Sequence, residues 1–309
     1  MIGPPLDQFI SIVDPEACQL RSLPNRVWVF GGPVETDLKE ASKSLRDSFW
    51  RQTLVAIPSE ENKWIARIDR PENHKEWWAF SGYDNLLQFE RDACYLAQAT
   101  ILFAESPGSL AELGALAIDD HLVKNLIVIL QTSFLDSKNR ESFLNLGPLK
   151  RVKDNQHLCV IGATEKAQLP SEDFQSINES IGAWLPPLQK TQVFKIDNPT
   201  HRLLLLADLI DLFLVTKIPE LKAAGKHLGV HYTDDEIAKA LKLLEFFDLI
   251  KMESRGLEHF FTFQKKSEAP WFDYTALGMR AFDRSRFKVD ASAWVESQPR
   301  LKSIWERVK

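Results

Sequence analysis

The sequence predicts an α/β protein, with a parallel sheet in its first part and a smaller domain of helices and a hairpin in its second. Short apolar runs alternate with segments of helical spacing up to about residue 165, a pattern typical of a parallel sheet covered on both faces. Beyond residue 200 the order becomes helix, helix, turn, helix, hairpin. With 309 residues, each part is long enough to bury a core of its own.

The composition is that of an ordinary globular protein. Hydrophobic residues make up 44% and charged residues 26%, and the net charge of −5 does not by itself indicate a nucleic-acid-binding protein. The cysteines, Cys18, Cys94 and Cys159, lie far apart and form neither a zinc motif nor a disulfide framework. No signal peptide or membrane-spanning run is recognised. We therefore expect a cytoplasmic protein in a reducing compartment, without a bound metal and without membrane association.

The elements of the first domain, which we place at residues 25–192, follow from the apolar runs. Residues 1–24 are rich in proline and show little periodicity, so an extended N-terminal arm is expected. The Trp-rich and charge-rich stretch 58–88 either closes over a site or packs against the domain. The predicted strands are 26–30, 53–57, 100–104, 125–130 and 158–161, and the predicted helices are 36–49, 87–97 and 109–121.

The second domain is predicted at residues 193–268. Helices are expected at 203–215, 219–228 and 233–247, and Thr233-x-x-Glu236 forms a capping box at the start of the third. Strands at 249–252 and 259–263 then form a hairpin, and this order is typical of a winged helix-turn-helix. The aromatic-rich segment 269–309 either covers the protein's own surface or contributes to a homo-oligomer.

The candidate site lies where the third predicted strand gives way to a helix. Ligands of open α/β sheets bind beyond the carboxyl ends of strands, where helix N-termini present free N–H groups. We expect Glu112 to be catalytic, although Ser109-x-x-Glu112 is also a capping box in which Glu112 would be structural. The residues expected to contact a substrate are Gly31, Gly32, Glu105, Ser106, Gly108 and Ser109.

The motif G-S-L-A-E-L-G at Gly108 to Gly114, together with Asp92 one helix earlier, resembles the nucleoside 2-deoxyribosyltransferase family. The resemblance covers roughly residues 25–165 and implies the Rossmann-like fold of that family. It implies that Glu112 is the nucleophile and Asp92 the general acid. The family often has a carboxylate a few residues before the nucleophile, a place near which Glu105 or Ser106 falls here.

The combination of this domain with a winged helix resembles, more narrowly, the ribosyltransferase/DNA-binding effector proteins of bacterial retrons. That resemblance implies a toxin-like effector of anti-phage defence with N-glycosidase activity. It implies NAD as a substrate rather than a cofactor. The implied partners are the retron reverse transcriptase and its multicopy, branched DNA–RNA product.

The expected chemistry agrees with the residues. Cleavage of an N-glycosidic bond develops oxocarbenium character at the anomeric carbon, which a carboxylate can attack or stabilise. A Glu in the first turn of a helix is kept ionised by the helix dipole. A neutral base leaves more readily once protonated, which gives Asp92 a role as general acid. The nicotinamide of NAD is already cationic, so loss of Asp92 is then expected to cost much less than loss of Glu112.

The predicted recognition helix begins with the acidic residues 234–236, which would repel phosphates, so reading of a DNA sequence is not favoured. Contact with a protein, or with the backbone of a structured nucleic acid, fits better. The candidate contact residues are Lys222, Lys226, Lys239, Lys242, Arg255, Lys265 and Lys266. Two other functions stay open from the residues alone: a salvage nucleoside deoxyribosyltransferase or hydrolase, and a DNA-binding regulator that senses a nucleotide.

Overall fold

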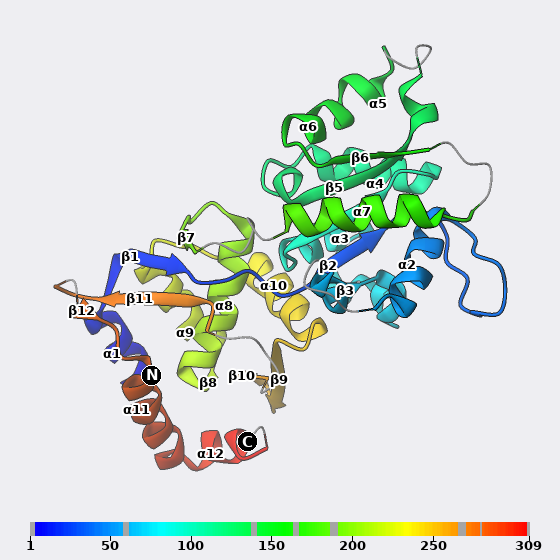
Figure 1. The fold of residues 1–309 in the computed structure, drawn as a ribbon. Helices are drawn as coiled ribbons and strands as arrows, with labels where there is room; N and C mark the ends of the chain where they lie inside the picture. The colour runs from blue at the N-terminus through cyan, green and yellow to red at the C-terminus, as the bar shows by residue number, and fades with distance from the viewer. Residues whose placement is uncertain are drawn as a thin grey trace. The chain divides into compact units, whose positions relative to one another are not determined.

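A computed structural model describes residues 4–57, 62–136, 141–162, 167–185, 191–264, 270–278 and 280–307 (Figure 1). By their contacts the residues divide into two compact units. The parallel-sheet unit consists of Pro24–Trp78 and Asn85–Gln189. The terminal unit, which contains both chain ends, consists of Met1–Leu23, Ala79–Asp84 and Lys190–Lys309.

The parallel-sheet unit contains a five-stranded sheet in which every pair is parallel, so the predicted α/β class is confirmed. The strands, in their order across the sheet, are β3 (Ile68–Asp69), β2 (Val27–Phe30), β4 (Ala99–Phe103), β5 (Leu126–Gln131) and β6 (Leu158–Ile161). The α-helices are α2 (Leu45–Val55), α3 (Leu86–Tyr95), α4 (Pro107–Ala117), α5 (Phe143–Leu146), α6 (Pro148–Asp154) and α7 (Ser171–Trp184). Short 3-10 turns are η1 (Lys63–Arg67), η2 (Pro71–Asn73), η4 (Leu122–Asn125) and η5 (Thr132–Leu135), and η3 (Trp77–Gly82) belongs to the terminal unit from Ala79 on.

Helices cover both faces of this sheet (Figure 1). On one face, Phe49 of α2 and Ile177 of α7 pack with every second residue of the central strands, such as Ile101 and Ile127. On the other face, the indole of Trp28 donates a hydrogen bond to the carbonyl of Ala93 in α3. Alternate residues of each strand therefore enter two different cores, which explains why the strands are apolar throughout.

The helix expected at 36–49 and the strand expected at 53–57 were both wrong, because a single helix, α2, begins at Leu45 and continues through Val55. Ser44 caps this helix by accepting a hydrogen bond from the backbone N–H of Asp47. The apolar residues that suggested a strand face solvent, with Val55 80% exposed. The fifth strand of the sheet is instead the two-residue β3, too short to be recognised from its sequence.

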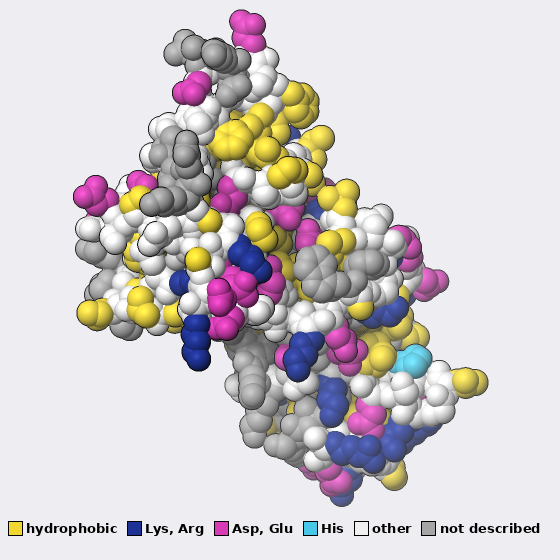
Figure 2. Space-filling model, turned by 90° about the vertical axis from the view of Figure 1, so that its right-hand side faces the viewer, with side chains coloured by type: hydrophobic (Ala, Val, Ile, Leu, Met, Phe, Trp, Pro, Cys, Tyr) yellow, Lys and Arg dark blue, Asp and Glu magenta, His cyan; other side chains and the backbone are white. Residues whose placement is uncertain are grey.

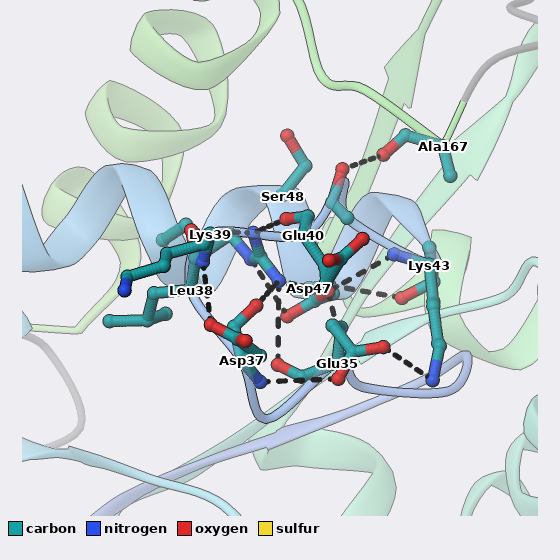
Figure 3. Close-up of polar contacts among 12 residues, drawn as sticks. Glu35, Asp37, Leu38, Lys39, Glu40, Lys43, Asp47, Ser48 and Ala167 are labelled. Carbon is teal, nitrogen blue, oxygen red and sulfur yellow. Dashed lines mark hydrogen bonds and ion pairs between the residues drawn. The ribbon is translucent and has the colours of Figure 1, made fainter.

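The loop between β2 and α2 is fixed by two side chains of α2. Oδ2 of Asp47 accepts hydrogen bonds of 3.1 Å from the backbone N–H groups of both Glu35 and Lys43, as Figure 3 shows. The guanidinium of Arg51 donates to the carbonyl oxygens of Leu38 and Glu35 and pairs with Asp47. This network satisfies backbone N–H and C=O groups of the loop that would have been paired within the helix expected at 36–49. It fixes the conformation of this loop at the carboxyl edge of the sheet.

In the terminal unit, the predicted N-terminal arm is wrong, because residues 4–20 form α1 (Pro4–Ile12) and β1 (Val13–Leu20). β1 pairs antiparallel with β11 (Phe272–Ala276) on one side and with β7 (Gln192–Val193) on the other. The sheet is completed by β12 (Arg280–Ala281). Leu6, Phe9 and Leu20 are almost fully buried, so these residues belong to a core rather than to an arm.

The rest of the terminal unit is built from helices and a hairpin. Its elements are α8 (Pro199–Phe213), β8 (Val215–Thr216), α9 (Ile218–His227), α10 (Asp234–Phe246), β9 (Ile250–Arg255), β10 (Glu258–Phe263), α11 (Arg284–Ser297) and α12 (Pro299–Trp305). β8, β10 and β9 form a three-stranded antiparallel sheet in that order. The capping box of Thr233 and Glu236 is confirmed. Trp271 and Phe287 of the C-terminal segment are buried in this unit. None of the helices among the described residues combines the length and apolarity needed to cross a membrane.

Candidate active site

Glu112 lies in the second turn of α4, because this helix begins at Pro107 rather than at Ser109. Ser106 is the N-cap: its hydroxyl accepts a hydrogen bond from the N–H of Ser109, and the Ser109 side chain accepts from the N–H of Ser106 in return. The capping box is thus complete without Glu112, and the structural interpretation of Ser109-x-x-Glu112 is wrong. The N–H groups that a Glu at N3 would have bonded are already satisfied.

Glu105 joins the end of β4 to the start of α2. Its Oε2 accepts a hydrogen bond of 2.7 Å from the backbone N–H of Leu45, and its Oε1 accepts bonds of 3.0 Å from the N–H groups of Arg46 and Gly32. A β-carbon on Gly32 would lie only 2.9 Å from Oε1, so this glycine permits a close approach by Glu105. For Gly31, with φ of +150°, the nearest contact of such a carbon would be Phe103, at 2.8 Å.

These contacts give five of the predicted substrate-binding residues a structural role. Glu105 and the two glycines meet at the junction of β2, β4 and α2. Ser106 and the fully buried Ser109 form the capping box of α4. Contact of these residues with a substrate stays a prediction. Gly108 differs from them, because it lines a pocket.

A pocket of about 580 Å³ lies beside α3 and α4 in the parallel-sheet unit. Its wall includes Phe30 at the carboxyl end of β2, where open α/β sheets bind their ligands. Of the residues predicted from the sequence, it brings together Glu112 and Gly108. The remaining lining residues are Leu86, Leu87, Gln88, Glu90, Arg91, Cys94, Ala111, Ala115, Leu116, Ile118 and Asp119. The wall is therefore mainly apolar with a few carboxylates, as expected of a small-molecule site.

The carboxylate of Glu112 is not satisfied within the part of the chain that the structure describes. Its Oε2 is buried there and has no hydrogen-bond partner. Burial and, after it, the negative charges of Glu90 and Glu72 raise the pKa of Glu112 to about 7, against the opposing effect of Arg46. The expectation that the helix dipole keeps Glu112 ionised is thus wrong, because the dipole acts mainly within the first turn.

Glu90 of α3 is a second carboxylate in the pocket that the sequence analysis missed. The indole Nε1–H of the buried Trp77 donates a hydrogen bond of 3.0 Å to its Oε1. Burial, followed by the charge of Glu72, raises the pKa of Glu90 despite that bond. A signal was present, since Glu90 follows Leu86 and precedes Cys94 at intervals of four residues, and all three lie on one helical face.

Asp92, predicted as the general acid, lies on α3 but is not among the lining residues of this pocket. Its Oδ1 is 3.1 Å from both Nε and Nη2 of Arg91, which does line the pocket. The helical geometry explains this placement, because a residue two positions after Glu90 points to a different side of the helix. The structure therefore brings Glu90, and not Asp92, to the pocket that contains Glu112.

The predicted contact residues of the terminal unit are partly engaged in local ion pairs. Lys222 pairs with Asp234 at 2.6 Å and Lys239 pairs with Asp235 at 2.9 Å. Arg255 pairs with Glu253 at 2.6 Å. Lys226 and Lys242 are exposed. Lys265 and Lys266 lie outside the described residues. On the face drawn in Figure 2, Lys and Arg are interspersed with Asp and Glu. Binding of nucleic acid or protein by these residues stays a prediction.

The comparisons with known proteins agree on one family. The family model described as "STM3845 retron effector protein" matches residues 42–252, which is more than half of the chain. An Escherichia coli protein named "Retron Ec73 putative ribosyltransferase/DNA-binding protein" is 44% identical over 69 residues, or 22% of this chain and 21% of that protein. Its counterpart from Escherichia coli retron Ec86, which carries the same description, is 37% identical over 75 residues, or 24% of each chain. The matched segments thus span no more than a quarter of either relative.

Proposed function

Since the chain belongs to the STM3845 retron effector protein family, we propose that it is an effector that cleaves the N-glycosidic bond of a nucleotide, with NAD as its substrate. The relatives in the two Escherichia coli retrons carry a ribosyltransferase name, which is the same class of chemistry. Transfer and hydrolysis differ only in whether an acceptor or water takes the sugar from the enzyme.

The observation that carries this proposal is the carboxylate of Glu112. It lines a pocket whose wall includes the carboxyl end of β2, where open α/β sheets bind their ligands. Its Oε2 is buried without a partner among the described residues. A buried and unsatisfied carboxylate oxygen destabilises a fold, and such groups recur at functional sites. An oxocarbenium-like sugar would supply the positive charge that this oxygen lacks.

A substrate with a cationic ring suits the charges of the pocket. Glu90 and Glu112 both line it, and a bound positive charge would favour the ionised, nucleophilic form of Glu112. The nicotinamide ring of NAD carries such a charge and leaves as a neutral molecule, so its departure needs no proton. The apolar wall formed by Phe30, Leu86 and Leu116 offers a surface for the flat ring.

We further propose that residues 199–263 of the terminal unit form a winged helix that contacts the retron's own products. The sequence of α8, β8, α9, α10, β9 and β10, with β10 between β8 and β9, supports this assignment. The acidic first turn of α10, residues 234–236, disfavours reading of bases, so contact with protein or with the phosphate backbone through Lys226 and Lys242, which are exposed, fits better. The partners would be the reverse transcriptase and its branched DNA–RNA product, which would restrain the enzyme until infection.

The test is release of nicotinamide from NAD by the purified protein, alone and bound to its reverse transcriptase and DNA–RNA. Wild type is compared with Glu112→Gln and with Glu179→Gln, an exposed glutamate of α7 that serves as the matched control. We expect release by wild type and by the control, none by Glu112→Gln, and suppression in the complex. Activity on nucleosides alone, without toxicity in cells, would point to a salvage enzyme. Nucleotide binding without cleavage, retained in Glu112→Gln, would point to a sensor.

A further inference from the structure

We propose that Glu90 is the general base of the hydrolytic step, and that it takes the place of Asp92, the predicted general acid, as the second carboxylate of the site. The inference rests on the proposed function. It starts from the finding that Glu90 and Glu112, on the neighbouring helices α3 and α4, line one pocket. A second carboxylate beside the nucleophile is what a two-step, retaining cleavage requires.

Trp77 gives Glu90 a fixed orientation. The indole is fully buried and donates to Oε1 of Glu90 over 3.0 Å, so the carboxyl group cannot rotate freely. A base held in this way can accept a proton in one direction, which is the geometric condition for general catalysis. Asp92 lacks this placement, because its carboxylate pairs with Arg91 and does not line the pocket.

The charges around the two carboxylates assign them different states. The charges of Glu90, Glu72 and Arg46 act on Glu112. The charge of Glu72 acts on Glu90, which also accepts the hydrogen bond of the Trp77 indole. Two carboxylates in one pocket disfavour each other's ionisation, and burial raises the pKa of both, to about 7 for Glu112. The hydrogen bond from Trp77 opposes this rise at Glu90 and favours its ionised form, in which it can act as a base.

The reaction then balances without an acid. In the first step, an oxygen of ionised Glu112 forms a bond to C1′ of the ribose, the bond from C1′ to the nicotinamide nitrogen breaks, and its electron pair neutralises the ring. In the second step, a water oxygen forms a bond to C1′ while Glu90 accepts the proton of that water. The bond between C1′ and Glu112 breaks, and its electron pair returns to the carboxylate.

The decisive variant is Glu90→Gln, which keeps the size of the side chain and removes the base. With NAD we expect a burst of nicotinamide close to one equivalent of enzyme, followed by turnover reduced by about 10²- to 10⁴-fold. Intact-protein mass spectrometry should show the sugar bound to the enzyme, and this adduct should be absent in Glu112→Gln. Azide needs no base to attack C1′, so adding azide should restore release of nicotinamide and yield a glycosyl azide.

Glu179→Gln, the exposed control, should turn over NAD at the wild-type rate without any effect of azide, and azide should not raise the turnover of Asp92→Asn, because Asp92 does not line the pocket. Three outcomes would overturn the role of Glu90 and leave the proposed function standing. They are wild-type turnover by Glu90→Gln, a folded Glu90→Gln that shows no burst of nicotinamide, and azide rescue of Asp92→Asn in place of Glu90→Gln. If Glu90→Gln does not fold, Glu90→Ala tests the same azide rescue. A wild-type protein that cleaves neither NAD nor any other nucleotide, free or in its complex, would contradict the proposed function itself.

Discussion

Oε2 of Glu105 lies 2.7 Å from the backbone nitrogen of Leu45 and accepts its hydrogen bond. Together with the bonds from Arg46 and Gly32 to Oε1, this contact makes one carboxylate the anchor of the first turn of α2. A carboxylate at a helix N-terminus satisfies N–H groups that have no partner within the helix. The end of β4 and the start of α2 are therefore held together by the side chain of Glu105.

Glu105→Gln should lower the free energy of unfolding by about 2–3 kcal/mol, because an amide nitrogen would face a backbone N–H in place of an accepting oxygen. Urea unfolding of the full chain measures this loss, with Glu179→Gln as the exposed control. A loss equal to that of the control would contradict the anchoring role. Reduced activity without reduced stability would instead support the substrate contact predicted from the sequence.

Ser109→Ala should lower the free energy of unfolding by about 1–2 kcal/mol, since the buried hydroxyl accepts hydrogen bonds from the N–H groups of Glu105 and Ser106. We expect the KM for the substrate to stay unchanged, because Ser109 is fully buried in the cap. Thermal unfolding and steady-state kinetics on the same preparation check both statements. A raised KM with an unchanged melting temperature would show that Ser109 binds substrate.

The stability of the protein should depend on pH through Glu112. Its pKa is about 7 in the folded chain, against 4.5 as its ordinary value, so the folded state binds the proton more tightly than the unfolded state. Stability from this group is complete below pH 4.5 and is lost as the pH rises through 7. Glu112→Gln, which cannot ionise, should therefore be more stable than wild type by roughly 1–3 kcal/mol at pH 8, at about 1.4 kcal/mol per pH unit.

Unfolding curves at pH 4.5 and pH 8 measure this difference, with Glu179→Gln as the control. The advantage of Glu112→Gln should disappear at the lower pH. An advantage of equal size at both values would mean that ionisation is not its cause.

Asp208→Asn should be among the most destabilising single changes in the terminal unit. The fully buried carboxylate accepts hydrogen bonds from the N–H of Trp271 at 2.9 Å and the hydroxyl of Tyr274 at 2.7 Å, and it pairs with Arg284 at 3.0 Å. The amide would remove the buried charge that pairs with Arg284 and put a donor where these groups need an acceptor; since Arg284 keeps Asp211 at 2.8 Å, the cost should be about 3 kcal/mol.

The matched control is Asp273→Asn, whose carboxylate is 60% exposed and pairs with Arg21 at 3.9 Å. This variant should change stability by less than about 1 kcal/mol. Chemical unfolding followed by tryptophan fluorescence compares the two. Equal effects would contradict the proposed importance of the buried pair.

The parts of the fold that the sequence predicted are those with a strong local signal. The central strands, β4 and β5, are unbroken apolar runs, and α10 begins at a capping box formed by Thr233 and Glu236. Glu112 could be selected as a catalytic candidate because its short motif directly follows a predicted strand. In each case the neighbouring residues alone determine the local structure.

The parts that could not be predicted depend on contacts between distant residues. β1 is a strand because Leu20 pairs with Phe272, and no local pattern indicates that pairing. α2 begins only at Leu45, where hydrogen bonds made by Asp47 and Arg51 hold the preceding loop. The helix therefore includes the apolar stretch 53–55, which by its sequence alone resembles a strand. Glu90 was passed over because its importance comes from Trp77 and Glu112, which belong to other elements.

The pairing of β1 with β11 determines the order in which the protein can mature on the ribosome. Residues 24–78 and 85–189 contain all the strands of the parallel sheet, so that unit can fold while later residues are still being synthesised. β1 is made before the parallel-sheet unit, yet it must wait for residues 272–276 before its main partner exists. A prematurely terminated product would therefore contain the Glu112 pocket without a finished terminal unit, so the nascent chain acquires its candidate catalytic part before the part proposed to keep it in check.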